Sequence, residues 1–121
     1  MGATVGHIEV LSDDPAPLRE FYSAVFGWRV GPVATDDPEQ MEYAMVEIED
    51  GEGAVTAGIG KRGAGFLPVT FYLRVDDLQA TLDSVAARGG RTVTQPLKVG
   101  PVTTIARFAD PAGNVIGLVK D

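Results

Sequence analysis

The segment GHIEVLSDDP, residues 6–15, contains the single histidine of this 121-residue chain. His7 and Glu9 alternate with Ile8 and Val10, which is typical of a strand with one polar and one apolar face. An imidazole near a carboxylate can supply a metal ligand, a general base or a hydrogen-bonding group in a pocket. It can equally be a structural residue bonded to a strand neighbour, so the interpretation depends on the other polar residues.

Three polar residues alternate with apolar ones in the segment VTFYLRV, in the second half of the chain: Thr70, Tyr72 and Arg74. Arg74 and Glu9 are expected either to orient a polar ligand together or to form an ion pair between the two halves. The Tyr72 ring is expected to stack on a ligand, donate a hydrogen bond from its hydroxyl, or fill the space itself.

Two further segments place polar or thioether side chains at the same parity: Tyr43 and Met45 in MEYAMVEIED, and Thr103 and Arg107 in PVTTIARF. We therefore predict one ligand-binding set: His7, Glu9, Tyr43, Met45, Thr70, Tyr72, Arg74, Thr103 and Arg107. His7 and Glu9 are its candidates for acid–base catalysis.

The elements that position these residues follow from periodicity and turn residues. The first half predicts a strand at 4–11, a helix that begins in SDDPAP and ends at Gly27, and strands at 28–30, 41–50 and 54–60. The apolar stripe of that helix is Leu18, Phe21, Tyr22 and Val25. The second half predicts a strand at 69–75, a helix within 76–90, and strands at 91–99, 101–109 and 114–121, the last two joined by the turn DPAG.

The order strand–helix–strand–strand–strand therefore occurs twice. An acidic pair precedes each helix, Asp13-Asp14 and Asp76-Asp77, and the interval between the pairs equals that between Gly27 and Gly90. We infer an internal duplication with modules at 1–62 and 63–121 that together form one structural domain. Ile8 and Val10 are expected to face the first helix, and Phe71, Leu73 and Val75 the second.

Composition restricts the partners. The net charge of −7 disfavours nucleic acid and anionic membranes, and the absence of cysteine excludes disulfides and thiolate chemistry. The N-terminal segment lacks the features of a signal peptide, and no apolar run is long enough to span a bilayer. We expect a cytoplasmic protein.

Three segments resemble a known family: HIEVLSDDPAPLREFYSAVFGW, FYLRVDDLQATLDSVAARGGR and FADPAGNVIGLVKD. They are similar to the modules of the vicinal oxygen chelate superfamily, which includes glyoxalase I, extradiol dioxygenases and bleomycin-resistance proteins. The resemblance implies an α+β fold of two tandem βαβββ modules that form a cupped, incomplete barrel. It also implies a homodimer.

In metal-using members of that superfamily, the resemblance implies ligands on the first and last strands of each module. His7 matches one such position, and the others fall at Thr70, near Ala57 and at Gly117. A catalytic divalent ion requires roughly three or four protein donors, and only His7 supplies one. We therefore expect no metal ligand set and no cofactor.

These observations predict a glyoxalase/bleomycin-resistance-like protein that binds a small organic molecule in its cup, in a sequestration or resistance role. One alternative is a lyase, isomerase or dioxygenase-type enzyme, either metal-free with His7 or Glu9 as base or metal-dependent with unconventional ligands. Another is a dimeric interaction module whose cup is filled.

Overall fold

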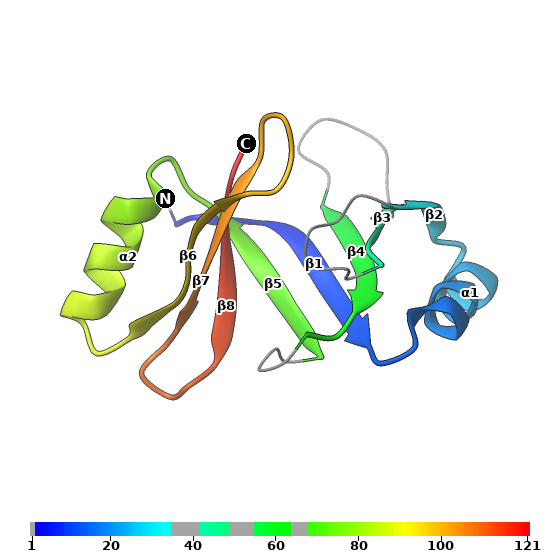
Figure 1. The fold of residues 1–121 in the computed structure, drawn as a ribbon, viewed down its shortest axis with the longest axis horizontal. Helices are drawn as coiled ribbons and strands as arrows, with labels where there is room; N and C mark the ends of the chain where they lie inside the picture. The colour runs from blue at the N-terminus through cyan, green and yellow to red at the C-terminus, as the bar shows by residue number, and fades with distance from the viewer. Residues whose placement is uncertain (1, 35–41, 49–54, 64–67) are drawn as a thin grey trace. The chain divides into compact units, whose positions relative to one another are not determined.

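The computed structural model describes residues 2–34, 42–48, 55–63 and 68–121 (Figure 1). The predicted α+β fold and the order strand–helix–strand–strand–strand, repeated once, are confirmed. The first set is β1 (Thr4–Ser12), α1 (Pro15–Phe26), β2 (Arg29–Val33), β3 (Ala44–Glu47) and β4 (Thr56–Lys61). The second is β5 (Val69–Arg74), α2 (Leu78–Ala87), β6 (Arg91–Lys98), β7 (Thr104–Ala109) and β8 (Val115–Lys120). Residues 41, 49, 50 and 54 of the strands predicted at 41–50 and 54–60 lie outside the described residues.

The chain divides by its internal contacts into two compact units. Unit 1 contains Met1–Gly6 and Thr70–Asp121, and unit 2 contains His7–Val69. The strand order is β2-β3-β4-β1 within unit 2 and β5-β8-β7-β6 within unit 1. In each unit the first and last strands of the βαβββ set are therefore adjacent, and they pair in parallel.

Helix α1 begins and ends where its sequence predicts. Asp14 is the N-cap, a proline occupies the first turn, and Gly27 ends the helix in the left-handed conformation at φ 70°. The residues of α1 that pack against the sheet are Leu18 and Tyr22, and the Tyr22 ring stacks on Trp28 with 4.7 Å between centroids. This packing gives unit 2 its core, whose buried strand residues are Val46, Ala57 and Ile59.

The predicted apolar stripe of α1 is too wide. Phe21 is 52% exposed and Val25 is 59% exposed, so these two residues lie beside the packed face and not within it. The reason is geometric: the helix contacts the sheet through β4 and β2, and residues four apart cover that narrow contact, as Leu18 and Tyr22 do.

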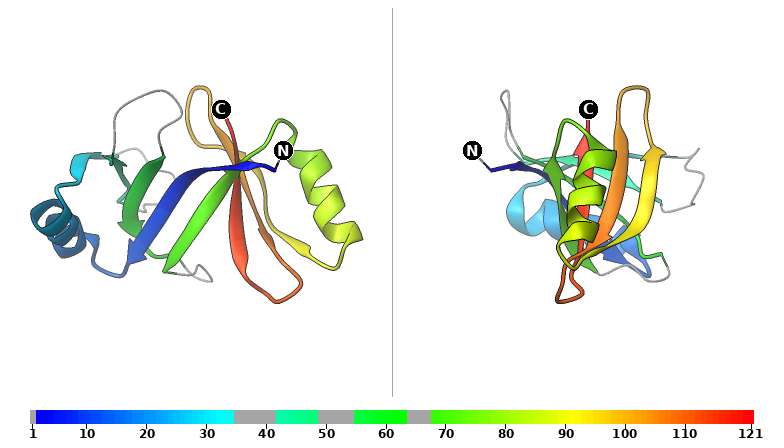
Figure 2. Two further views of the ribbon diagram at one scale, coloured as in Figure 1. Left: turned by 180° about the vertical axis from the view of Figure 1, so that it is seen from behind. Right: turned by 90° about the vertical axis from the view of Figure 1, so that its left-hand side faces the viewer.

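Unit 1 repeats the arrangement, with α2 against one face of β6, β7 and β8 (Figure 2). Its core contains Leu78 and Leu82 from α2 and Ala106 and Leu118 from the strands. Leu73 and Val75 pack against this core as expected. Phe71 does not: it is 39% exposed, which corrects its assignment to the face that packs on α2.

The predicted turn DPAG joins β7 to β8. One carboxylate oxygen of Asp110 accepts hydrogen bonds from the Ala112 and Asn114 backbone N–H groups at 2.9 and 3.0 Å, and Gly113 has φ 93°. The other carboxylate oxygen of Asp110 accepts a hydrogen bond from the Asn114 side-chain amide at 2.9 Å. These bonds, the one from the Asn114 side chain foremost, hold the pKa of Asp110 below its usual value. Neither α1 nor α2 is long and apolar enough to cross a membrane, nor is any other helix in the described part of the chain.

Candidate functional site

The face of the unit 2 sheet that points away from α1 carries polar side chains. Ile8 and Val46 pack toward the helix, so the alternate residues His7, Glu9 and Met45 lie on the opposite face. Glu9 is only 3% exposed, whereas Met45 is 51% exposed. This face therefore combines a buried carboxyl group with an accessible thioether.

His7 is held at both ring nitrogens. Its Nδ1 lies 2.7 Å from the Thr56 hydroxyl oxygen, and its Nε2 lies 2.7 Å from the Tyr43 hydroxyl oxygen. A neutral imidazole donates from one nitrogen and accepts at the other, and both hydroxyls can complement either tautomer. Thr56 is the strand partner of His7 across β1 and β4, so the backbone register places the first of these bonds.

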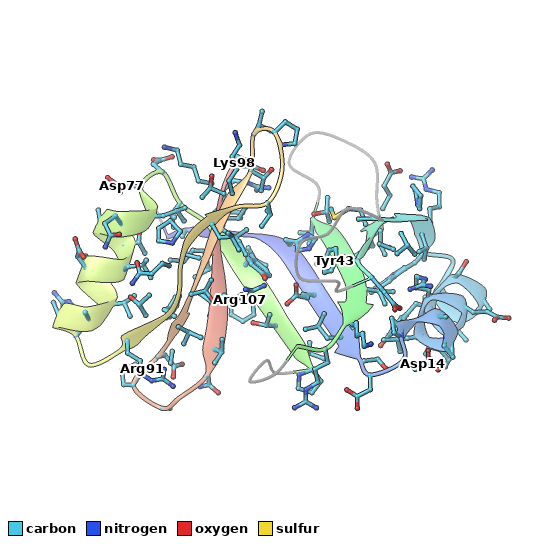
Figure 3. The ribbon with its side chains drawn as sticks, in the orientation of Figure 1. Asp14, Tyr43, Asp77, Arg91, Lys98 and Arg107 are labelled. Carbon is cyan, nitrogen blue, oxygen red and sulfur yellow. The ribbon has the colours of Figure 1, made fainter. Side chains whose placement is uncertain are left out.

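Tyr43 reaches His7 by crossing the strand between them. It precedes β3, and β4 lies between β3 and β1 in the sheet. The Tyr43 ring lies over Gly58 of β4, where any Cβ atom would collide with the ring. Gly58 therefore provides the space in which the ring lies, and the Tyr43 hydroxyl extends to His7 Nε2. Figure 3 labels Tyr43 beside β4.

Unit 1 contains a different polar cluster. The Arg107 guanidinium donates from Nε and Nη2 to the Tyr72 hydroxyl oxygen, at 3.1 and 2.8 Å. Tyr72 is 4% exposed and Arg107 is 5% exposed, so the pair is buried. Ile105 and Val119 pack around the Tyr72 ring. The result is a cationic group fixed on a phenol oxygen in apolar surroundings.

Gly117 lies under the Tyr72 ring, as Gly58 lies under that of Tyr43. The two residues are direct partners across β5 and β8, and a Cβ at Gly117 would collide with the ring. Each unit thus places a tyrosine ring over a glycine of its last strand.

The remaining predicted site residues have other contacts. Thr70 donates from its hydroxyl to the Val115 carbonyl at 2.8 Å, which ties β5 to β8. The Arg74 guanidinium forms an ion pair with Asp121 at 3.2 Å, with both side chains about 40% exposed, and lies against Gly6. Thr103 is half-buried, and its carbonyl accepts from the Val99 N–H at 3.0 Å.

Thr56 and Gly58 were not predicted as site residues, and the last-strand position of module one was predicted incorrectly. Ala57 is fully buried in the core against α1, so it is on the wrong face. The residue that corresponds to Gly117 is Gly58, which pairs with Glu9 as Gly117 pairs with Tyr72. A shift of one residue along a strand exchanges its two faces, which explains the error. The parallel register with β1 is the signal that identifies the correct residue.

The residues at these positions do not fit a divalent metal site. Gly58 and Gly117 have no side chain that could ligate a metal, and the Thr70 hydroxyl is bonded to the Val115 carbonyl. Within residues 2–34, 42–48, 55–63 and 68–121, no group of three or more His, Cys, Asp or Glu side chains is placed to hold an ion. The donor set is thus smaller than the three or four ligands that zinc, nickel or iron requires.

Comparison with known proteins identifies the family. The sequence matches the Glyoxalase/Bleomycin resistance protein/Dioxygenase superfamily over residues 4–118, so the chain belongs to this superfamily. A glyoxylase-like domain-containing protein of Didymella fabae is 33% identical over 117 residues, which cover 91% of this chain and 88% of that protein. A probable lactoylglutathione lyase of Vibrio parahaemolyticus is 31% identical, with coverage of 84% and 79%.

Not all relatives have the same length. The putative glyoxylase CFP32 of Mycobacterium tuberculosis is 26% identical over 95% of this chain, and the chain spans 44% of that protein. Among solved structures, a variant of Streptomyces coelicolor methylmalonyl-CoA epimerase in complex with 2-nitronate-propionyl-CoA superposes with a TM-score of 0.76. It covers 98% of this chain and 94% of its own, at 20% identity, which supports the fold assignment.

Proposed function

We propose that the protein binds a small organic molecule without a metal ion, through the sheet faces that point away from α1 and α2. The observation that carries this proposal is the position of His7, whose two ring nitrogens are both engaged by the hydroxyls of Thr56 and Tyr43. A metal ion would have to displace one of these bonds and would still find a single imidazole. A ligand that packs on this face and bonds to its other polar groups needs no such displacement.

The burial of ionisable side chains on these faces supports the same proposal. Glu9 and Arg107 are 3% and 5% exposed. Ionisable side chains are seldom buried to this extent, and buried ionisable groups are concentrated at ligand-binding and catalytic sites. Sequestration of a toxic or antibiotic compound requires binding alone, and this role fits a face that lacks a metal ligand set.

Ligand screening tests the proposal directly. We expect that a library of partly apolar compounds, screened by NMR against ¹⁵N-labelled protein, shifts the amides of β1, β3 and β4 in unit 2. His7→Gln retains polar groups near both hydroxyls and should weaken binding several-fold, whereas His7→Ala should weaken it further. Ligands that shift only other amides, or affinities that both variants leave unchanged, contradict the proposal.

A second candidate is a metal-free enzyme, which the 31% identity to a probable lactoylglutathione lyase favours. Glu9 is a buried carboxyl on the same face as His7, and a carboxylate can act as a general base. If Glu9 takes a proton from the substrate, Glu9→Gln should lower kcat by at least a hundredfold and change the dissociation constant little. Turnover with full metal dependence contradicts this candidate.

A further inference from the structure

We propose that the exposed side of α1 is a docking surface for a second copy of this chain, with the two α1 helices packed antiparallel across a two-fold axis. The surface consists of Phe21, Val25 and Phe26, and we call it the α1 aromatic face. The interface involves unit 2 of each copy, and it does not depend on the binding of a ligand.

The α1 aromatic face is accessible, and its rings contact one another. Phe21, Val25 and Phe26 are 52%, 59% and 62% exposed. The Phe21 ring contacts the Tyr22 ring edge-on at 5.2 Å between centroids and the Phe26 ring at 6.2 Å. These contacts restrict the rings before a partner binds, so docking costs little further conformational entropy. Aromatic side chains of this kind contribute a large share of the binding free energy at protein interfaces.

The second helix of the repeat shows that the fold does not require this face. α1 and α2 begin at equivalent positions, and the interval between their N-cap aspartates relates Phe21 to Ser84 and Val25 to Arg88. Ser84 and Arg88 are exposed, and none of the large hydrophobic side chains that are exposed in the described parts of the chain belongs to α2. Neighbouring exposed apolar residues, as in α1, are characteristic of interaction sites. The difference between the two helices therefore indicates a partner for α1.

The charges beside this face favour a second copy as the partner. Glu20 is exposed on α1, and Arg29 is exposed just beyond the end of the helix. When two α1 helices cross antiparallel near Ala24, Glu20 of each copy comes level with Arg29 of the other, because the two residues lie at similar distances on either side of the crossing. Arg29 also pairs with Glu47 of its own chain at 3.3 Å, and a guanidinium can donate to more than one carboxylate. An anionic lipid surface is disfavoured by the net charge of −7.

The size of the α1 aromatic face predicts a weak dimer. A fully buried aromatic side chain removes about 150–250 Å² from water, so three half-exposed side chains offer roughly 250–350 Å² per copy. A stable interface buries about 800 Å² per partner. The face is therefore the apolar centre of an interface whose rim is polar, and we expect a dissociation constant on the order of 10–100 µM.

Sedimentation equilibrium tests the surface. From about 1 µM to about 1 mM protein, the wild-type chain should change from monomer to dimer. Phe21→Ser combined with Val25→Arg gives α1 the residues that α2 has at these positions, and it should weaken the dimer at least about tenfold. Val102→Ser removes a 76% exposed side chain from unit 1, and this control should leave the dissociation constant unchanged. Circular dichroism verifies that the variants are folded.

An exchange of charges tests the antiparallel arrangement and leaves the aromatic face intact. Glu20→Lys and Arg29→Glu should each weaken the dimer, because each variant brings like charges together across the two-fold axis. In an equimolar mixture of the two variants, the mixed dimer has opposite charges at both contacts. Its dissociation constant should be roughly fivefold lower than that of either variant alone, the size expected for exposed ion pairs. An ion pair within one chain gives no such gain.

Three results overturn the proposal. A wild-type chain that stays monomeric over the whole range overturns it, even if α1 then binds a different protein. A dimer that Phe21→Ser with Val25→Arg leaves unchanged, or that Val102→Ser abolishes, shows that the interface lies on another surface. A mixture of Glu20→Lys and Arg29→Glu that associates no more strongly than the separate variants overturns the antiparallel arrangement.

Discussion

The ring of Tyr72 lies on Gly117, its direct partner across the parallel strands β5 and β8. An aromatic ring that covers a strand glycine protects the exposed backbone and fixes the position of the ring. Here it also fixes the phenol oxygen that accepts two bonds from Arg107.

Substitution of Gly117 by alanine should therefore displace the ring. We expect Gly117→Ala to lower the free energy of unfolding by about 1–3 kcal/mol, the usual cost of overpacking. Urea denaturation measures this change. Gly2→Ala is the matched control, because a Cβ at Gly2 meets no atom within 4 Å and should leave stability unchanged. Equal stability of the two variants contradicts the prediction.

The Tyr72 hydroxyl should stabilise unit 1 through Arg107. Tyr72→Phe keeps the ring but removes the acceptor of two guanidinium N–H groups in a residue that is 5% exposed. Loss of such a buried partner costs about 1–3 kcal/mol. Thermal and urea denaturation should show this loss for Tyr72→Phe, and a loss of similar size in Tyr22→Phe would refute the specific role of the buried pair.

The two helix N-termini provide a comparison within one chain. The Asp77 carboxylate accepts a hydrogen bond from the Ala80 N–H at 3.0 Å, whereas the Asp14 side chain makes no such capping bond. Asp77→Ala should therefore lower the free energy of unfolding by about 1 kcal/mol, a typical N-cap value. Asp14→Ala should cost less. Denaturation of both variants in the same buffer measures the difference, and the reverse ranking would show that the cap geometry is not decisive.

The Asp110 carboxyl should make stability depend on pH. Its pKa is lowered in the folded chain, chiefly by the Asn114 side chain, so its ionised form stabilises the fold above the unfolded pKa of about 3.9. That contribution is lost as the pH falls through the lower folded pKa. We expect Asp110→Asn to be less stable than the wild type at pH 7 and the difference to shrink below about pH 4. Asp76→Asn, an exposed aspartate outside the turn, is the control; a pH-independent difference would contradict this account.

Metal analysis should find no stoichiometric ion. After incubation with nickel, zinc or manganese and dialysis, we expect well below one equivalent per chain by elemental mass spectrometry, because the residues present offer a single imidazole. Gly58→Glu should not restore binding, since the Tyr43 ring fills the space that this side chain needs. One equivalent of tightly held ion in the wild-type protein would overturn the proposed mode of binding.

Periodicity was sufficient to predict the element order, both helices and the turn at Asp110, because each depends on local sequence. It did not predict the register of β4. Alternation alone does not determine which residues of β1 and β4 pair, and Ala57 was therefore assigned in place of Gly58. The hydrogen bond between His7 and Tyr43 could not be predicted from the sequence either. Alternation predicts that both residues share a face, but the direction of a long side chain depends on what its neighbours leave open.

The parallel pairing of β1 with β4 has a kinetic consequence. His7 is 36 positions from Tyr43 and 49 positions from Thr56, so both of its bonds form only after a long loop has closed. Contacts of such sequence separation form slowly during folding, because the chain loses entropy before they contribute. The imidazole of His7 therefore reports on the pairing of β1 with β4, and its bonds to Thr56 and Tyr43 should be absent from any partly folded state in which these strands are apart.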